Sequence, residues 1–193
     1  IKMAVSYMRV NGNKISTHIA FYNFGSAGQM ELNNQVGELN VDDVLAPQIF
    51  FCDNSTAVAV RTDGFTVFSG SQSPKEKKTV KFDQEIISTF HDGNRIGFVF
   101  DGGDSGHKYL MKVYNTGGKN TMQKYFDLQY NSITLQKDKI VLFNEKEFAI
   151  YKLNGQKTFQ GKYRKPIQNV LSIRGFRKYM VITEDSADLI RLG

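Results

Sequence analysis

Residues 103–106 read Gly-Asp-Ser-Gly, which is the core of the nucleophile motif of serine proteases. A nucleophilic Ser105 would need a histidine as its base and a carboxylate to orient that histidine, and His18 with Asp42 would have to fill these roles. The residue after the motif is His107 instead of glycine, and the flanking sequence consists of short apolar runs and turns. We therefore interpret the motif as an expanded turn between two strands and predict no catalytic residue.

The residue types that bind metals do not form a ligand set in the sequence. The segment from Asp101 to Asp104 could offer carboxylates to Ca²⁺, but it lacks the ordered acidic positions and the closing glutamate of a calcium loop. The histidines are His18, His91 and His107, and they fall in different units of the chain, whereas zinc needs ligands that converge. We predict no metal site and interpret the histidines as structural.

Other reactive or ligand-binding patterns also favour structural interpretations. Cys52 is the single cysteine and stands in an apolar run, so we expect a small buried core residue and no disulfide. Gly117 and Gly118 lead from one strand to another and not to a helix N-terminus that could bind phosphate, so no cofactor is predicted. Residues 54–56 form a glycosylation sequon, which is placed in a tight turn.

The chain is basic, with a formal net charge of +6. Its basic residues form three short clusters in separate loops, which are Lys75, Lys77 and Lys78, then Arg164 and Lys165, then Arg174, Arg177 and Lys178. Binding to a nucleic-acid backbone needs a continuous basic stripe with aromatic side chains for stacking, so we predict no nucleic-acid partner. Net charge acts at long range, and we expect a weak attraction to anionic envelope polymers.

The strongest pattern in the chain is a repeat. Tyr22, Phe68 and Tyr114 stand 46 residues apart, and each closes the same short apolar pattern. A fourth copy ends at Tyr151, 37 residues later, and the interval shortens because the third unit carries a longer loop. Self-similarity of this kind indicates an array of similar β units.

Each unit is predicted to contain four short strands separated by turn-forming residues. A first apolar run and the repeated pattern form a hairpin, for which the second unit supplies Ile49–Phe51 and the turn Asp53–Ser55. A third strand follows, placed at Met30 and Leu32 in the first unit, and Ser69 to Lys78 is interpreted as a mobile loop. Fourth apolar stretches precede the next unit, at Val44–Leu45, Ile86–Ile87, Ile133–Leu135 and Val170–Ile173.

These strands predict an all-β fold, a β-propeller-like array of four-stranded antiparallel blades with about four and a half repeats. We treat residues 1–193 as a single domain, with repeats at roughly 1–43, 44–88, 89–134 and 135–170 and a partial one at 171–193. The chain begins directly in strand-like residues, so we expect an excised part of a longer protein. Whether the propeller is incomplete stays open.

The ends of the repeats carry a family resemblance. The segments Tyr22-Asn23-Phe24-Gly25, Tyr114-Asn115-Thr116-Gly117 and 148–155 resemble blades of PQQ-like and WD40-like propellers. The whole chain is similar to the C-terminal part of an uncharacterised family of surface proteins of Gram-positive anaerobes. That resemblance implies a membrane-spanning helix N-terminal to this region and an extracytoplasmic propeller. The chain departs from many propellers in having no tryptophan, and ligands for a quinone cofactor cannot be mapped on it.

We therefore expect a non-enzymatic, extracytoplasmic binding or scaffold module at the cell surface. Its loops would engage a protein or a cell-envelope polymer, and membrane attachment would come only through an anchor not present in this chain. The alternative is an enzyme, of hydrolase or quinone-dependent dehydrogenase type, with a site at the propeller axis that is completed by residues outside this chain. Open blade edges would allow self-association.

Overall fold

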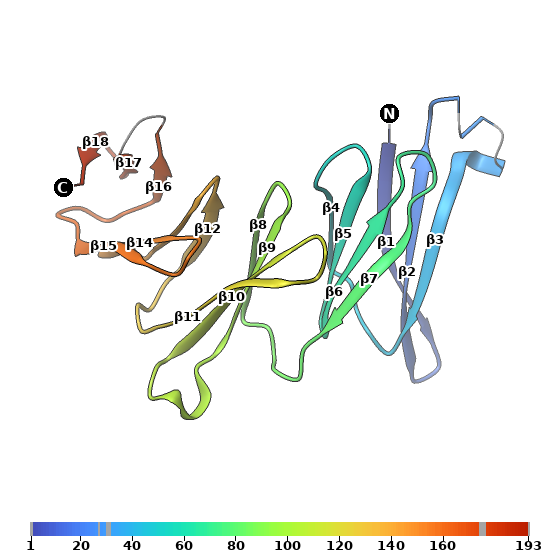
Figure 1. The fold of residues 1–193 in the computed structure, drawn as a ribbon, viewed down its shortest axis with the longest axis horizontal. Helices are drawn as coiled ribbons and strands as arrows, with labels where there is room; N and C mark the ends of the chain where they lie inside the picture. Colours follow the sequence, from blue (N-terminus) through green and yellow to red (C-terminus); the bar gives the residue numbers. More distant parts are fainter. Residues whose placement is uncertain (1, 27, 30–31, 174–176, 193) are drawn as a thin grey trace. The chain divides into compact units, whose positions relative to one another are not determined.

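The computed structural model describes residues 2–26, 28–29, 32–173 and 177–192. The fold is all-β, as predicted: the described residues form eighteen strands and two 3₁₀ turns, arranged as five antiparallel sheets (Figure 1). Counted along the chain, the second, third and fourth sheets have four strands each, and the first and fifth have three. Within the described ranges, no helix is long and apolar enough to cross a membrane.

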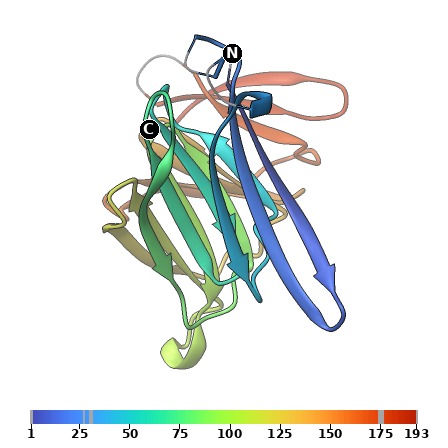
Figure 2. The same ribbon diagram turned by 90° about the vertical axis from the view of Figure 1, so that its right-hand side faces the viewer.

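The chain forms two compact units. Unit 1 contains Ile1–Ile86 with Thr116–Lys119, and unit 2 contains Ile87–Asn115 with Asn120–Gly193. In unit 1 the first sheet has the order β1-β2-β3, with strands β1 (Lys2–Asn11), β2 (Lys14–Asn23) and β3 (Gln35–Asp42). The second sheet of this unit contains β4 (Gln48–Phe51), β5 (Thr56–Arg61), β6 (Gly64–Ser69) and β7 (Lys75–Lys81). The β1–β2 hairpin extends beyond β3 at its turn (Figure 2).

Unit 2 contains the other three sheets. The third sheet consists of β8 (Ser88–Asp92), β9 (Arg95–Asp101), β10 (Tyr109–Asn115) and β11 (Asn120–Phe126). The fourth consists of β12 (Ser132–Gln136), β13 (Lys139–Phe143), β14 (Glu147–Lys152) and β15 (Lys157–Lys162). The fifth consists of β16 (Asn169–Ser172), β17 (Lys178–Ile182) and β18 (Ala187–Arg191).

The middle strands of the second and fourth sheets are buried on both faces, which explains their continuous apolar runs. In β13 and β14, Ile140 to Phe143 and Phe148 to Tyr151 are all buried, whereas β15 at the edge is mostly exposed. Apolar side chains of the fourth sheet pack on both sides. One cluster joins Leu142 to Val99 and Met111 of the third sheet, and the other joins Ile150 to Val181 of the fifth.

The repeated aromatic residue marks a repeated bulge. The pairing register between the last two strands of each of the first four sheets shifts immediately before Tyr22, Phe68, Tyr114 and Tyr151. A bulge places one extra residue on one strand and re-aims the side chains around it. In the third and fourth sheets the extra residue is a threonine, and its hydroxyl donates to the carbonyl of the residue before the aromatic, over 3.1 Å in both. The repeated aromatic residue therefore occupies the equivalent position, next to a bulge, in each of these four sheets.

The position of the bulge also shows which strands of a four-stranded blade the first sheet contains. It makes β2 the counterpart of the third strands β6, β10 and β14, so the first sheet has the second, third and fourth strands of a blade. The fifth sheet, β16-β17-β18, has the first three. Among the residues that the structure describes, β1 and β18 therefore have one unpaired edge each, at the positions where complete sheets carry another strand.

The second unit of the repeat was partly mispredicted. Ile49–Phe51 lies in β4, but the turn at Asp53–Ser55 leads to β5, a strand that we did not predict. β5 reads Thr-Ala-Val-Ala-Val-Arg, and its two alanines weaken the signal of large β-forming side chains. The turn between the second and third strands of this sheet is Thr62-Asp63, with Arg61 buried and bonded to the Asp63 carboxylate at 2.8 Å.

Three loop and strand boundaries also differ from prediction. The third strand of the first sheet is β3 and not the predicted segment at Met30 and Leu32: Met30 lies outside the described residues, and Leu32 begins a 3₁₀ turn. Val44–Leu45 and Ile86–Ile87 lie in loops, next to β4 and β8. The predicted loop at Ser69–Lys78 is wrong in its second half, because residues 75–78 form the exposed start of β7.

The predicted repeat boundaries follow the sheets only approximately. The boundary at 134/135 falls inside β12, and the one at 170/171 falls inside β16. The structure divides into two compact units, and the treatment of residues 1–193 as one domain stays a prediction.

Candidate functional site: a basic groove in unit 2

The residues weighed as a catalytic triad do not assemble into one. Gly103–Ser105 forms a 3₁₀ turn between β9 and β10, and Ser105 Oγ accepts a bond from the backbone N of His107 at 3.2 Å. His18 is buried on β2 of unit 1, where its Nδ1 lies 2.5 Å from Asn40 Oδ1 and its Nε2 3.6 Å from Glu38 Oε2. Asp42 pairs with Ser16 on the same sheet, two positions away from the partner of His18.

His107 forms a side-chain hydrogen bond that the sequence did not indicate. Its Nδ1 lies 2.9 Å from Asp127 Oδ2, and Asp127 Oδ1 accepts a bond from the backbone N of Lys108 at 2.9 Å. The backbone bond from Lys108, followed by the bond from His107, lowers the pKa of Asp127 below its usual range. The imidazole also stacks on Tyr125 with ring centres 5.8 Å apart. Both members of the pair are exposed to solvent, and the pair anchors the loop before β10.

The other predicted structural residues are placed as follows. Asp101 Oδ1 accepts a bond from the backbone N of Gly103 at 2.8 Å and so holds its own turn. In the part of the chain that the structure describes, no group of three or more His, Cys, Asp or Glu residues could hold a metal ion. His91 lies in β8, where burial lowers its pKa.

Cys52 is not a core residue, contrary to prediction. It is partly buried in the turn between β4 and β5, where its backbone N donates to Thr56 O at 2.9 Å. Desolvation, with a smaller contribution from the charge of Asp53, raises the pKa of the Cys52 thiol to about 11. The sequon at 54–56 lies partly in this turn, as expected.

The three basic clusters predicted from sequence have different environments. Lys75, Lys77 and Lys78 lie on the exposed part of β7. Arg164 and Lys165 are neutralised by ion pairs with Asp188 and Asp185, at 3.4 Å and 2.9 Å. Of the third cluster, Arg174 lies outside the described residues, Lys178 begins β17, and Arg177 lines a hollow. Four lysines line the same hollow.

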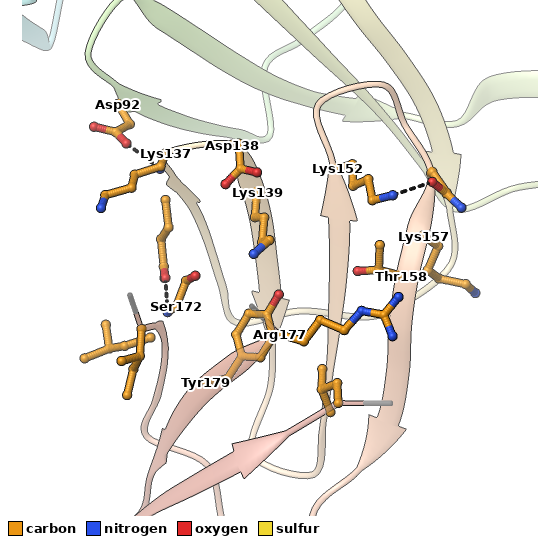
Figure 3. A pocket seen from close by; sticks show the side chains of 15 residues that line it. Asp92, Lys137, Asp138, Lys139, Lys152, Lys157, Thr158, Ser172, Arg177 and Tyr179 are labelled. Atoms are coloured by element: carbon orange, nitrogen blue, oxygen red, sulfur yellow. Dashed lines mark hydrogen bonds between the residues drawn. The ribbon is translucent and has the colours of Figure 1, made fainter. Parts of the chain in front are cut away.

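We call this hollow the basic groove (Figure 3). It has a volume of about 930 Å³ and lies within unit 2. Two turns of the fourth sheet, β12–β13 and β14–β15, form one part of it, and β16, β17 and the residues that follow them form another. Five basic side chains and two carboxylates line it, namely Lys137, Lys139, Lys152, Lys157, Arg177, Asp92 and Asp138.

Three of the groove lysines are held by uncharged partners. Lys139 Nζ lies 5.4 Å from the ring centre of Tyr179, a cation–π contact to a side chain that is only 2% exposed. Lys152 Nζ donates to Gln156 Oε1 at 2.9 Å, and Lys157 Nζ donates to Gln160 Oε1 at 2.8 Å. Among the described residues, no carboxylate lies within ion-pair distance of these three ammonium groups. Their positions are restrained while their charges remain uncompensated.

Two other polar side chains of the groove lining form hydrogen bonds within the protein. The carboxylate of Asp92 accepts a bond from the backbone N of Lys137 at 2.6 Å and fixes the β12–β13 turn. Gln136 bridges the fourth and fifth sheets, because its amide donates to Val170 O at 2.9 Å and accepts from Ser172 N at 2.5 Å. In Figure 3, Arg177 extends from beside Tyr179 toward Thr158. The bonds of Asp92 and Gln136 therefore hold backbone segments of the groove lining in place.

A second hollow of about 360 Å³ shares Lys157 with the basic groove. It is lined by Lys124 and Lys157, but also by Asp127 and Glu147, so its charges are nearly balanced. The excess positive charge is therefore a property of the basic groove and not of every hollow in unit 2.

Comparison with known proteins places the chain in a family. Residues 1–192 match the family of unknown function DUF5711. The chain belongs to the DUF5711 family. No curated protein sequence matches this DUF5711 chain.

Solved structures similar to the DUF5711 chain share its fold at low sequence identity. Sqt1 of Saccharomyces cerevisiae has a TM-score of 0.56 at 10% identity, with 94% of this chain and 55% of that chain covered. BamB of Moraxella catarrhalis has a TM-score of 0.51 at 10% identity, with coverages of 95% and 60%. BBS1N, solved in complex with ARL6DN, has a TM-score of 0.53 at 9% identity, with coverages of 87% and 58%. These neighbours support the propeller-like blades, and the chain spans less than two thirds of each.

Sequence reasoning missed the basic groove because its lysines come from separate turns. Lys137 and Lys139 flank one turn of the fourth sheet, and Lys152 and Lys157 flank the other. In an antiparallel blade these two turns lie at the same end of the sheet. Lysines beside alternate turns were therefore the pattern in the sequence that could have indicated the groove. A search for basic runs could not find them, because the two pairs are separated by strands β13 and β14.

Proposed function

We propose that this DUF5711 chain is a non-enzymatic binding module that engages an anionic partner through the basic groove. The partner is an acidic segment of a protein or an anionic polymer of the cell envelope. The observation that carries the proposal is the set of groove lysines whose ammonium groups are positioned by uncharged partners. Unpaired, restrained charges attract an oppositely charged ligand without first having to break an ion pair.

A binding role is favoured over catalysis by the chemistry of the lining. Of the two groove carboxylates, that of Asp92 accepts a bond from a backbone N–H, and the hydroxyl of Thr158 donates to Ile150 O at 3.1 Å. Catalysis by a nucleophile or general base needs a group that is free to reach the substrate. The alternative enzyme, with a site at the propeller axis completed outside this chain, predicts that a bound polymer is shortened or chemically changed.

The proposal also places the chain outside the cell, with membrane attachment through an anchor not present in this chain. Its support is the resemblance to surface proteins described above. The complex of BBS1N with ARL6DN supports a protein partner by analogy of fold alone. Protease treatment of intact cells that carry the parent protein would test the location, because only an extracytoplasmic chain is digested.

The test of binding compares two charge reversals of equal size. The double variant K139E/K152E changes the groove, and K75E/K77E changes the exposed start of β7 in unit 1. We expect the groove variant alone to lose binding to both poly-L-glutamate and inorganic polyphosphate at moderate salt. Equal losses in both variants would show non-specific attraction by net charge. Recovery of shortened polymer after incubation would favour the enzyme.

A further inference from the structure

We infer that the basic groove takes a linear chain of phosphate groups that carries no bases. This inference rests on the proposed function and specifies its ligand. Three properties of the groove support this inference. Most of its cations are lysines, it shares Lys157 with the second hollow, and its aromatic side chain, Tyr179, is buried.

The cations of the groove are mainly lysines. Four of the five basic side chains that line it are lysines, and one is Arg177. A guanidinium matches a planar carboxylate through two parallel bonds, whereas an ammonium acts as a point charge with donors in several directions. Lys152 and Lys157 each use one donor on a glutamine oxygen, which leaves further N–H groups for a ligand. Lysine binds phosphate as a point charge, so it can meet phosphate oxygens from several directions without a planar two-bond geometry.

The shape of the lining favours a chain over a compact ligand. The groove's volume of about 930 Å³ is near the upper end for a small-molecule site. Lys157 belongs both to the groove and to the second hollow, which has a further 360 Å³ and contributes Lys124. A linear ligand that extends beyond the groove would therefore meet the second hollow at Lys157. Because Asp127 and Glu147 line the second hollow, the strongest anion contacts are expected in the groove itself.

The aromatic side chain of the groove is not available for base stacking. Tyr179 is the aromatic residue among the described lining residues, and it is 2% exposed with Lys139 over its ring. Proteins that bind single-stranded nucleic acids stack successive bases on exposed aromatic faces. The groove itself offers charge without such a face, whereas Tyr125, which is 36% exposed, lines the second hollow. Within the groove, phosphates and not bases therefore provide the recognition.

The experiment titrates the full chain with four polymers matched in charge number. The probes are inorganic polyphosphate, poly(glycerol phosphate), oligothymidylate and poly-L-glutamate, measured by calorimetry over a range of salt concentrations. We expect tighter binding of the two phosphate polymers without bases. The comparison between these two also distinguishes an inorganic from a polyol phosphate source.

Matched variants locate the binding. Lys139→Met and Lys152→Met keep the aliphatic stem and remove the charge, and Lys124→Met is the control in the second hollow. Each groove substitution is expected to weaken phosphate-polymer binding roughly fivefold. The slope of log affinity against log salt should fall by about one for each lysine removed. Lys124→Met should have a smaller effect, and thermal unfolding of every variant checks that the fold is intact.

Each result decides between the inference and the proposed function. Equal or tighter binding of poly-L-glutamate through the groove would overturn the phosphate inference and leave the binding module intact. Tightest binding of oligothymidylate would overturn the exclusion of bases. If no polymer binds, both the inference and the proposed function fail.

Discussion

The ammonium nitrogen of Lys139 lies 5.4 Å from the ring centre of Tyr179, and the ring itself is almost completely buried. The tyrosine belongs to the apolar cluster that joins the fourth and fifth sheets, together with Val141, Ile150 and Val181. Packing therefore fixes the ring, and the ring fixes one charge of the basic groove. This contact links the core of unit 2 to its proposed ligand site.

The contact predicts different outcomes for two substitutions of Tyr179. Tyr179→Phe keeps an aromatic face beneath Lys139, so polyanion affinity should change little. Tyr179→Leu removes the cation–π contact, worth about 0.5–1 kcal/mol at an exposed site, and should weaken binding beyond any effect on stability. Binding titrations and unfolding curves of the two variants test this. Equal affinity of the leucine variant would show that Lys139 does not need the ring.

Cys52 should be unusually unreactive while the chain is folded. Burial raises the thiol pKa from 9.0 to about 11, so at pH 8 the thiolate fraction falls about a hundredfold relative to an unperturbed thiol. Because the folded-state pKa is the higher one, the associated stability is present below pH 9 and is lost as pH rises toward 11. The rates of iodoacetamide labelling of Cys52 in folded and denaturant-unfolded chains measure this difference in reactivity. Similar rates in both states would contradict the raised pKa.

The His107–Asp127 pair should make stability depend on acid pH. The pKa of Asp127 is lowered in the folded chain, so its contribution is present above the unfolded carboxyl pKa and is lost as pH falls through the folded one. Asp127→Asn should lower the melting temperature at neutral pH, with a difference from wild type that shrinks in acid. Asp104→Asn, on the nearby turn, is the control. A difference that is independent of pH would rule out this charge as the cause.

The unpaired edges of β1 and β18 predict self-association. Met8 on β1 and Leu189 on β18 are exposed by 57% and 61%, and exposed strand edges pair with other chains. We expect light scattering to detect dimers at high concentration, and Met8→Lys or Leu189→Lys to reduce them. Ile87→Lys, at an exposed loop position, is the control. A strict monomer at every concentration would exclude this association.

The fold class was predictable because the aromatic positions Tyr22, Phe68, Tyr114 and Tyr151 share one structural cause. Each stands at the bulge between the last two strands of its sheet, and the repeat in sequence reports that bulge. β5 was missed because a polar turn at Asp53–Ser55 precedes it and small side chains fill it. Its burial comes from packing within unit 1, where Ala57 and Ala59 contact larger neighbours, and local sequence does not reveal that packing.

The candidate site was less predictable than the fold. A basic run such as Lys75 to Lys78 is conspicuous in sequence, yet it lies on an exposed strand. Arg164 and Lys165 also form a run, but acidic residues more than nineteen positions away compensate them. The groove depends on pairing that brings two turns to one end of a sheet, so its charge becomes visible only when the strand order is known.

The most direct test of the groove is a lysine footprint of the wild-type chain. Acetylation with and without inorganic polyphosphate, read by mass spectrometry, reports the accessibility of each lysine in one experiment. We predict that polyphosphate protects Lys139, Lys152 and Lys157 and leaves Lys75, Lys77 and Lys78 reactive. Protection confined to the β7 lysines, or spread evenly over both groups, would contradict it.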